Sequence, residues 1–167
     1  DIYNALTQCE EFIEQFGGHK YAAGLTLAPE NYQKFKEKFE QVVSQTIDKS
    51  LLIPEISIDA EIEFLDITPK FFRILKLMAP FGPKNMKPIF KASSVRDNGY
   101  GKKVGADETH LKLNLFQGNN KKTINAIGFG LGEKINLVKD DFDIVFSLDE
   151  NEWNGYKSIQ LLLKDLK

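Results

Sequence analysis

The sequence of 167 residues is poor in the side chains on which thiol, disulfide and metal chemistry depend. It contains one cysteine, Cys9, and two histidines, His19 and His110. A single cysteine excludes an internal disulfide framework and a cysteine-rich zinc site, and Cys9 falls in a helical pattern that favours burial. No set of aspartates with ligand spacing accompanies the histidines, so a two-metal hydrolytic centre has no convergent carboxylates here. We therefore expect no metal ion and no other cofactor to bind within these residues.

The sequence also lacks a long apolar run and a strong net charge. No stretch approaches the roughly 18 apolar residues that mark a membrane-spanning helix, and no signal peptide is visible. The formal net charge is −2 and the pI about 5.8, which gives no global indication of nucleic-acid binding. These absences favour a cytoplasmic protein with no membrane contact. Because a helical pattern is already under way at Asp1, we expect the sequence to be part of a longer protein.

The first fifty residues predict two helices around a short strand. Apolar residues at three- and four-residue spacing predict a helix over residues 1–15. These residues are Ile2, Leu6, Cys9, Phe12, Ile13 and Phe16. Gly17 and Gly18 are expected to end that helix, a strand should follow over residues 21–27, and Pro29 suits the first turn of a second helix. The apolar stripe of the second helix comprises Tyr32, Phe35, Phe39, Val42, Val43 and Ile47.

Gly17, Gly18 and His19 form a motif with two interpretations. Adjacent glycines free the backbone for positive φ and for close approach to a ligand, and an imidazole can donate a hydrogen bond to a phosphate oxygen. Bare backbone N–H groups beside that imidazole would form a phosphate-binding loop. The alternative is a helix-capping glycine followed by a tight turn and a buried histidine. The residues alone leave both interpretations open.

From about residue 56 the pattern changes to short strands. Residues 49–55 are a connector, residues 56–62 alternate like a half-buried strand, and Thr68-Pro69 is typical of a helix start. Residues 80–90 are rich in proline and fix the chain between helix and strand. Five further strands are predicted at Ile89–Val95, His110–Phe116, Thr123–Phe129, Asp143–Leu148 and Lys157–Asp165. Asn154-Gly155 predicts a type I′ hairpin between the last two, and this spacing favours a small closed β-barrel.

Charge is uneven along the second half. Between residues 84 and 122 there are nine basic and three acidic residues, a local balance of +6. The basic residues are Lys84, Lys87, Lys91, Arg96, Lys102, Lys103, Lys112, Lys121 and Lys122. With Tyr100 and Phe116 interleaved, basic loops around a β surface suit the backbone and bases of a single-stranded nucleic acid. The alternative is a set of lysines that only solubilises the loops.

Two stretches resemble families of nucleases and phosphoesterases. Residues 16–27, FGGHKYAAGLTL, resemble the glycine-histidine motif of the DHHA1 domain of DHH phosphoesterases. The second half is similar to the OB-fold domain of the RecJ single-stranded-DNA exonuclease family, and it follows a DHHA1 ending as in that family. The motifs that carry this likeness are Pro80-Phe81-Gly82-Pro83 with Asn85, Pro88 and Phe90, His110–Leu113, Ala126–Phe129, Trp153-Asn154-Gly155, Gln160-Leu161 and Lys164-Asp165. Lys84 and Met86 depart from the family's pattern, which usually has glycine and proline around its asparagine.

The resemblance implies an α+β protein with two parts. Residues 1–50 would be the last helix-loop-strand-helix piece of an α/β DHHA1 domain, and residues 51–167 an OB-like β-barrel. The parent would hydrolyse single-stranded DNA from the 5′ end in DNA repair and recombination. Its Mn²⁺ or Mg²⁺ would be bound by an upstream DHH domain, so these residues alone would be inactive. Gly17, Gly18 and His19 would contact a substrate phosphate, with His19 assisting the chemistry.

The residues that we expect to bind single-stranded DNA come from both parts. They are Gly17, Gly18, His19, Lys84, Lys87, Arg96, Tyr100, Lys102, Lys103 and Lys112. Leu113, Ile127 and Leu161 are expected in the barrel core, with Trp153 as a plug rather than a stacking platform. Two other functions stay open. One is a noncatalytic OB module that binds single strands or a protein, and the other is a different DHH/DHHA1 phosphoesterase acting on short oligoribonucleotides or cyclic dinucleotides.

Overall fold

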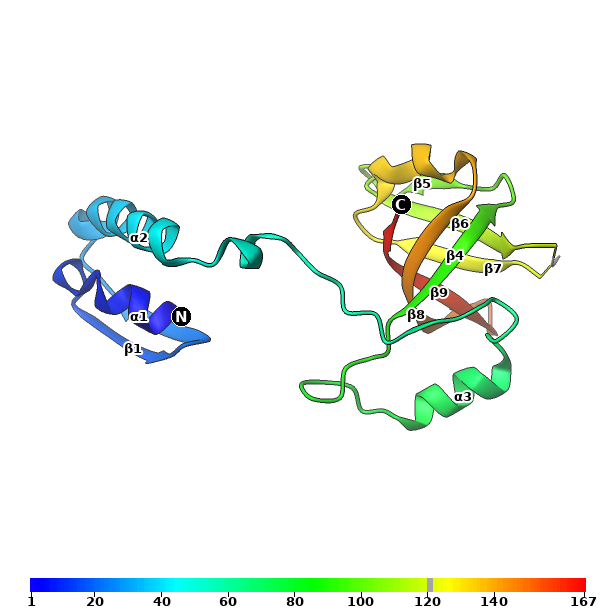
Figure 1. Cartoon of the computed structure of the whole chain (residues 1–167), viewed down its shortest axis with the longest axis horizontal. Coiled ribbons are helices and arrows are strands. Elements are labelled where there is room, and N and C mark those ends of the chain that lie inside the picture. The colour runs from blue at the N-terminus through cyan, green and yellow to red at the C-terminus, as the bar shows by residue number, and fades with distance from the viewer. Residues whose placement is uncertain (120–121) are drawn as a thin grey trace. The chain divides into compact units, whose positions relative to one another are not determined.

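A computed structural model describes residues 1–119 and 122–167 of the chain. The chain divides into two compact units, residues 1–55 and residues 56–167. Figure 1 shows helices α1 and α2 with a short sheet in the first unit, and a strongly curved sheet with helix α3 in the second. The predicted α+β class is confirmed. Within the described ranges, no helix combines the length and the apolar character needed to cross a bilayer.

The first unit consists of two helices and a two-stranded antiparallel sheet. Its elements are α1 (Ile2–Thr7), β1 (Gln15–His19), β2 (Ala22–Thr26) and α2 (Tyr32–Thr46). Short 3₁₀ helices cover Glu10–Phe12, Pro29–Asn31 and Lys49–Leu52. The second predicted helix is confirmed as α2, and Cys9 is fully buried as expected. The core around Cys9 contains Ala5 and Val42, with Ile13, Phe35, Phe39 and Val43 packed against it.

The helix predicted over residues 1–15 is wrong in its second half. Helix α1 ends at Thr7, and strand β1 follows and pairs with β2. The ring of Phe16 lies 5.6 Å from that of Tyr3, so the apolar spacing reflects a strand packed against a helix rather than one continuous helix. The two motif glycines therefore lie within a strand and do not cap a helix.

The second unit is built on a sheet that closes on itself. Its strands are β3 (Ala60–Glu61), β4 (Phe90–Asp97), β5 (Lys102–Val104), β6 (His110–Gln117), β7 (Ile124–Gly128), β8 (Phe142–Trp153) and β9 (Tyr156–Leu166). The order across the sheet is β3-β4-β8-β9-β7-β6-β5, and an additional pairing joins β4 to β6. Strands β4, β6, β7, β9 and β8 thus form a ring, in which β7 and β9 run parallel. A five-stranded Greek-key barrel of this kind is an OB fold, so the predicted barrel is confirmed.

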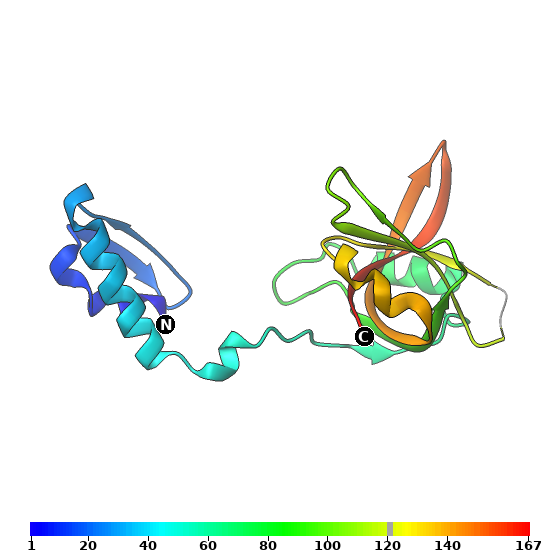
Figure 2. The same ribbon diagram turned by 90° about the horizontal axis from the view of Figure 1, so that it is seen from above.

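The five strands predicted from residue 89 onward are all present, with shifted bounds. Strands β8 and β9 are longer than expected because they continue past the barrel as a hairpin, which Figure 2 shows in orange and red. The residues of its turn, Asn154 and Gly155, have φ values of 51° and 79°. Both are positive, as the predicted type I′ turn requires.

Two short strands differ from the sequence prediction. Strand β5 was not predicted, because its three residues lie among turn-forming glycines and form a strand by pairing with β6. A short edge strand with lysines is a common way to prevent unwanted strand pairing. The strand predicted over residues 56–62 is reduced to β3, which runs parallel to β4. Ile56 and Ile58 are exposed rather than half-buried.

Helix α3 (Pro69–Leu77) packs against the barrel core and begins as predicted. Thr68 Oγ1 accepts the N–H of Phe71 at 3.1 Å, which satisfies one free donor of the first turn. Phe72 and Leu75 of the helix join Phe71 in packing against the core. The fully buried side chains of this core include Phe64, Ile67, Val95, Leu111, Leu113, Leu115, Ile144, Phe146, Leu161 and Leu166.

The predicted core residues are only partly correct. Leu113 and Leu161 are buried, as expected. Ile127 is half-buried and lies on the outer face of β7, since its neighbour Ala126 points inward. Trp153 is 72% exposed, so the prediction that it plugs the barrel is wrong. Its strand extends beyond the barrel, which carries the indole to the tip of the hairpin.

Gly132 provides a test of close packing in the second unit. It begins the 3₁₀ helix Gly132–Lys139 and lies against the residues before β6. A Cβ on Gly132 would lie 2.4 Å from the carbonyl oxygen of Glu108 and 2.8 Å from the carbonyl carbon of Thr109. Because both contacts are with backbone, Gly132→Ala should lower the free energy of unfolding by about 1–3 kcal/mol, the usual cost of overpacking. Urea-induced unfolding followed by circular dichroism measures the change.

Gly82→Ala is the matched control for this substitution. A Cβ on Gly82 meets nothing within 4 Å, and the φ of Gly82 lies outside the positive region. An equal loss of stability in both variants would contradict the steric explanation.

Candidate nucleic-acid interface

The outer face of β6, β7 and β9 carries a band of polar side chains. Alternate residues of a strand point to the same face, and the outward residues of the band are Lys112, Asn114, Asn125, Ser158 and Gln160. Asn114 lies opposite Asn125, and Asn125 lies opposite Gln160. The band therefore crosses three neighbouring strands as one row.

Amide side chains link the strands of this band. Asn114 Nδ2 donates to Asn125 Oδ1 at 2.8 Å, and Asn98 Nδ2 donates to Asn114 Oδ1. Asn98 follows directly after β4, so the chain of amides runs from the end of β4 to β7. Amides present both donors and acceptors to base edges and phosphate oxygens, and their mutual hydrogen bonds hold them in place.

Two hollows lie along this face. The first, of about 340 Å³, is lined by Tyr100, Lys102, Lys112, Leu113, Asn114 and Asn125. The second, of about 540 Å³, is lined by Lys112, Asn125, Ser158 and Gln160 and by Asn151, Trp153 and Tyr156 of the β8–β9 hairpin. Because Lys112 and Asn125 line both, the hollows join into one surface, which we call the barrel face.

Exposed aromatic rings lie at both ends of the barrel face. Tyr100 is 75% exposed in the first hollow, whereas Trp153 and Tyr156 are 72% and 81% exposed in the second. Trp153 and Tyr156 are paired across the hairpin turn. Sequence reasoning placed Trp153 inside the barrel and missed Tyr156, although the Asn154-Gly155 turn was a signal that both flank an exposed tip. Such rings can stack with nucleic-acid bases.

Two lysines of the barrel face lie directly opposite each other. Lys102 of β5 is paired with Lys112 of β6, and neither forms an ion pair with an acid in the part of the chain that the structure describes. Like charges opposite each other on an antiparallel pair are destabilising. An anion bound between Lys102 and Lys112 would relieve this repulsion. The structure thus brings together three of the sequence-predicted site residues, Tyr100, Lys102 and Lys112.

Other basic residues between positions 84 and 122 lie away from the barrel face. Lys103 is on the side of β5 shared with the buried Leu111, opposite to Lys102. Arg96 pairs with Asp141. Lys121 lies outside the described residues.

Lys84 and Lys87 lie in and after the proline-rich turn. Lys84 has a φ of 70° in the turn closed by Gly82 and Asn85. Lys87 Nζ lies 3.3 Å from Asp149 Oδ2 on β8. Acids from distant parts of the sequence therefore neutralise part of the positive balance that a linear count assigns to this stretch.

The glycine-histidine motif of the first unit lies at a hairpin tip. Gly17 and Gly18 pair with Gly24 and Ala23 of β2, and His19 is the last residue before the turn. The exposed imidazole accepts the N–H of Tyr21 at Nδ1, at 3.2 Å. A neutral ring that accepts at Nδ1 carries its proton on Nε2, which leaves Nε2 available as a donor to an anion.

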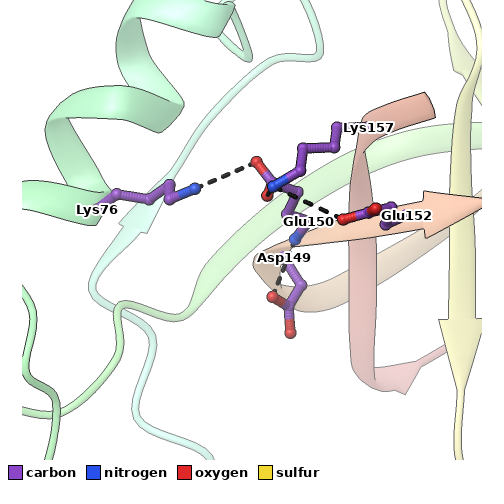
Figure 3. Close-up of polar contacts among 5 residues, drawn as sticks. All are labelled: Lys76, Asp149, Glu150, Glu152 and Lys157. Atoms are coloured by element: carbon purple, nitrogen blue, oxygen red, sulfur yellow. Dashed lines mark hydrogen bonds and ion pairs between the residues drawn. The ribbon is translucent and has the colours of Figure 1, made fainter. Parts of the chain in front are cut away.

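Glu150 connects helix α3 to the β8–β9 hairpin. Figure 3 shows its carboxylate between two lysines: Oε2 lies 3.1 Å from Lys76 Nζ and Oε1 lies 3.0 Å from Lys157 Nζ. Lys157 also lies 3.7 Å from Glu152. Hydrogen bonds from Lys157 and then from Lys76 lower the pKa of the Glu150 carboxyl below its usual value, and Glu150 raises the pKa of Lys157.

The described residues do not fit a Mn²⁺ or Mg²⁺ site. Within residues 1–119 and 122–167, no group of three or more His, Cys, Asp or Glu side chains is placed to hold a metal ion. Hard divalent cations need several oxygen ligands that converge on one point.

Comparison with known proteins identifies the second unit. Residues 58–165 match the family model described as the RecJ OB domain. The single-stranded-DNA-specific exonuclease RecJ of Bacillus subtilis (strain 168) is 29% identical over 168 residues, which cover 99% of this chain and 21% of that protein. The protein of the same name from Escherichia coli (strain K12) is 25% identical over 158 residues, which cover 91% of this chain and 26% of that protein. The chain spans between a fifth and about a quarter of the length of these relatives.

Solved structures share the fold of this chain. The crystal structure of RecJ in complex with Mn²⁺ from Thermus thermophilus has a TM-score of 0.72 at 24% identity, covering 98% of this chain and 23% of that chain. The structure of RecJ in complex with Mg²⁺ from the same organism has a TM-score of 0.71 at 25% identity, covering 99% of this chain and 24% of that chain.

The pKa of Glu150 tests the contacts between α3 and the hairpin. Lys157→Met should raise it toward the ordinary value of about 4.3, and Lys76→Met should raise it less, because the hydrogen bond from Lys157 is the larger cause. An NMR titration of the side-chain carboxyl measures both changes. Because the pKa is lowered in the folded chain, these contacts stabilise the fold above the unfolded pKa. Their contribution is lost as the pH falls through the lowered folded value.

Lys70→Met on the same helix is the control, because no ion pair joins Lys70 to the described residues. If the pKa of Glu150 were the same in all three variants and in the unchanged chain, the two ion pairs would not exist in solution.

Proposed function

The chain belongs to the RecJ OB domain family, and from this premise we propose that it is the strand-holding part of a 5′→3′ single-stranded-DNA exonuclease. Its relatives carry the name of a single-stranded-DNA-specific exonuclease. The barrel face is the surface to which we assign the strand. We also propose a role of the parent in DNA repair and recombination, and a cytoplasmic location.

The observation that carries this proposal is the chemistry of the barrel face. In OB folds, the face of the second and third strands and the loops after the first and fourth strands bind oligonucleotides. In chain order, the five strands of the ring are β4, β6, β7, β8 and β9, so β6 and β7 are the second and third strands. Lys102 and Tyr100 lie between the first and second strands, and the hairpin with Trp153 joins the fourth to the fifth. The position of these side chains supports single-strand binding.

The barrel face would bind a single strand through its phosphate backbone and through bases that are not paired with a second strand. Lys102 and Lys112 would bind phosphates, which removes their mutual repulsion. Tyr100, Trp153 and Tyr156 would stack on bases, each stack contributing about 1–3 kcal/mol regardless of sequence. The row of amides would hydrogen-bond to whichever base edges or phosphate oxygens come within reach. Such a surface suits an enzyme that must accept any sequence.

We assign hydrolysis of the phosphodiester to other parts of the parent protein. Its relatives are several times longer than this chain, which supports a separate DHH domain that binds Mn²⁺ or Mg²⁺. Residues 1–50 would be the end of a DHHA1 domain and residues 51–167 the OB domain. Gly17, Gly18 and His19 would then contact a substrate phosphate from the first unit.

Lys102 tests the barrel face directly. Lys102→Gln should reduce the slope of log affinity against log salt for an oligothymidylate by about 0.7, the contribution of one phosphate contact on a single strand. The same loss corresponds to about fivefold weaker binding at about 0.1 M salt. Fluorescence anisotropy of a labelled oligonucleotide at several salt concentrations measures both quantities.

Lys103→Gln is the matched control, because it removes the same charge from the opposite side of the same short strand. Equal effects of the two substitutions, or a salt slope for Lys102→Gln equal to that of the unchanged chain, would show that the barrel face does not bind the strand.

His19 tests the role of the first unit in the full-length enzyme. His19→Ala should lower turnover by about 10²-fold, as the loss of one donor to a developing negative charge does, with little change in the affinity for single-stranded DNA. Steady-state kinetics and equilibrium binding separate the two effects. Lys20→Gln, in the adjacent turn, is the control. Unchanged turnover in His19→Ala would restrict His19 to supporting the hairpin turn.

A further inference from the structure

A second hollow surface of the barrel unit lies beside α3. It has a volume of about 700 Å³ and is lined by apolar side chains from both sides. Phe72 and Leu77 of α3 and Ile159 of β9 contribute accessible apolar surface, and the buried Ile67 and Ile124 lie beneath them. Leu77 is 79% exposed, and Phe72 and Ile159 are half-buried, so the apolar surface of these three residues is open to solvent. We call this hollow the α3 groove. Its size lies within the range of small-ligand pockets, about 300–1,000 Å³.

The rim of the α3 groove is basic. The cations that line it are Arg73, Lys76, Lys122 and Lys157, whereas Glu150 is the one carboxylate among the described lining residues. Glu150 contacts both Lys76 and Lys157 (Figure 3). Arg73 is exposed and forms no ion pair within the described residues. The groove therefore combines an apolar floor with an excess of positive charge.

The α3 groove is continuous with the barrel face. Asn125 and Ser158 line both the groove and the second hollow of the barrel face. A strand that crosses the barrel face toward the β8–β9 hairpin would reach the groove without leaving a surface of apolar and basic side chains.

We propose that the α3 groove binds a further nucleotide of the same single strand that occupies the barrel face. The base lies on the apolar floor beside Phe72 and Ile159, and the phosphate contacts Arg73. A nucleotide supplies a flat apolar surface and a negative charge, which are the two properties that the groove complements. This inference rests on the proposed function, because it extends the path of the strand from the barrel face.

Glu150 regulates the affinity of this subsite. Its carboxylate holds Lys76 and Lys157 at the groove and competes with an incoming phosphate for both of them. Removing the charge by Glu150→Gln should therefore strengthen nucleotide binding in the groove, whereas removing a rim cation should weaken it. A purely structural role of these residues would not give effects of opposite sign.

Oligonucleotide length separates the α3 groove from the barrel face. We would compare oligothymidylates of about 4 and about 16 nucleotides, the limits of the site sizes of OB folds. Arg73→Gln should weaken binding of the longer strand by about fivefold at about 0.1 M salt, the loss of one phosphate contact, and leave the shorter strand unaffected. Glu150→Gln should bind the longer strand more tightly, with the shorter strand again unaffected. Quenching of Trp153, the one tryptophan of the chain, reports binding at the barrel face in each case.

Lys70→Gln is the matched control, because Lys70 is exposed on the same helix but does not line the groove. Unchanged binding of the longer strand by Arg73→Gln, while Lys102→Gln still weakens it, would overturn this inference and leave the proposed function intact. Equal losses for both lengths would place Arg73 at the barrel face and also overturn it. Failure of both Arg73→Gln and Lys102→Gln to weaken binding would overturn the proposed function itself. Arg73-dependent binding of a labelled oligoglutamate but not of DNA would assign the groove to an acidic protein and overturn the inference.

Discussion

The pairing of one strand, β4, with both of its neighbours in the ring, β6 and β8, is the constraint on which the barrel unit depends. Residues 90–92 and Val95 pair with β8, and residues 95–97 pair with β6, so Val95 has a partner on each side. In the pairing with β8 the register shifts between Ala92 and Val95, and Ser94 there has a φ of 53°. Such irregularities bend a strand and increase its twist, and here the bend lets β4 close the ring. Asp97 then accepts hydrogen bonds from β6 and from the loop after β4. Closure of the barrel and placement of the loop that carries Tyr100 therefore have the same structural origin.

The elements that sequence could predict are those that local interactions fix. The strands of the barrel and the hairpin at Asn154-Gly155 follow from alternation and turn chemistry, which a short window of sequence contains. Strand β1 was hidden because the apolar spacing of Phe16 fits a helix as well as a strand packed on one. Trp153 was misplaced because its exposure depends on how far β8 extends beyond the barrel, which no local pattern states. Strand β5 was missed because it exists only through its pairing with β6.

In the candidate site, too, local sequence indicates some features, and contacts between distant segments determine the others. A linear count groups Lys102 with Lys87 and Arg96, but in the fold Lys87 and Arg96 pair with acids that are distant in sequence. The positive charge that remains on the barrel face is smaller than the count suggests and lies next to exposed aromatic rings. Sequence counting picked out Lys122 but could not show that it shares a basic rim with Arg73, Lys76 and Lys157 at the α3 groove. These cations come from α3, from the residues just before β7 and from β9, and only the packing of the helix on the barrel brings them together.

The place of β9 in the ring has a consequence for how the protein is made. This strand lies between β7 and β8, although it is the last of the five to be synthesised. Until it leaves the ribosome, β7 and β8 each present an unpaired edge, and such edges invite association with other chains. Ser158 of β9 also lines both the barrel face and the α3 groove. The barrel face and the α3 groove are therefore completed together, in the step in which β9 closes the barrel.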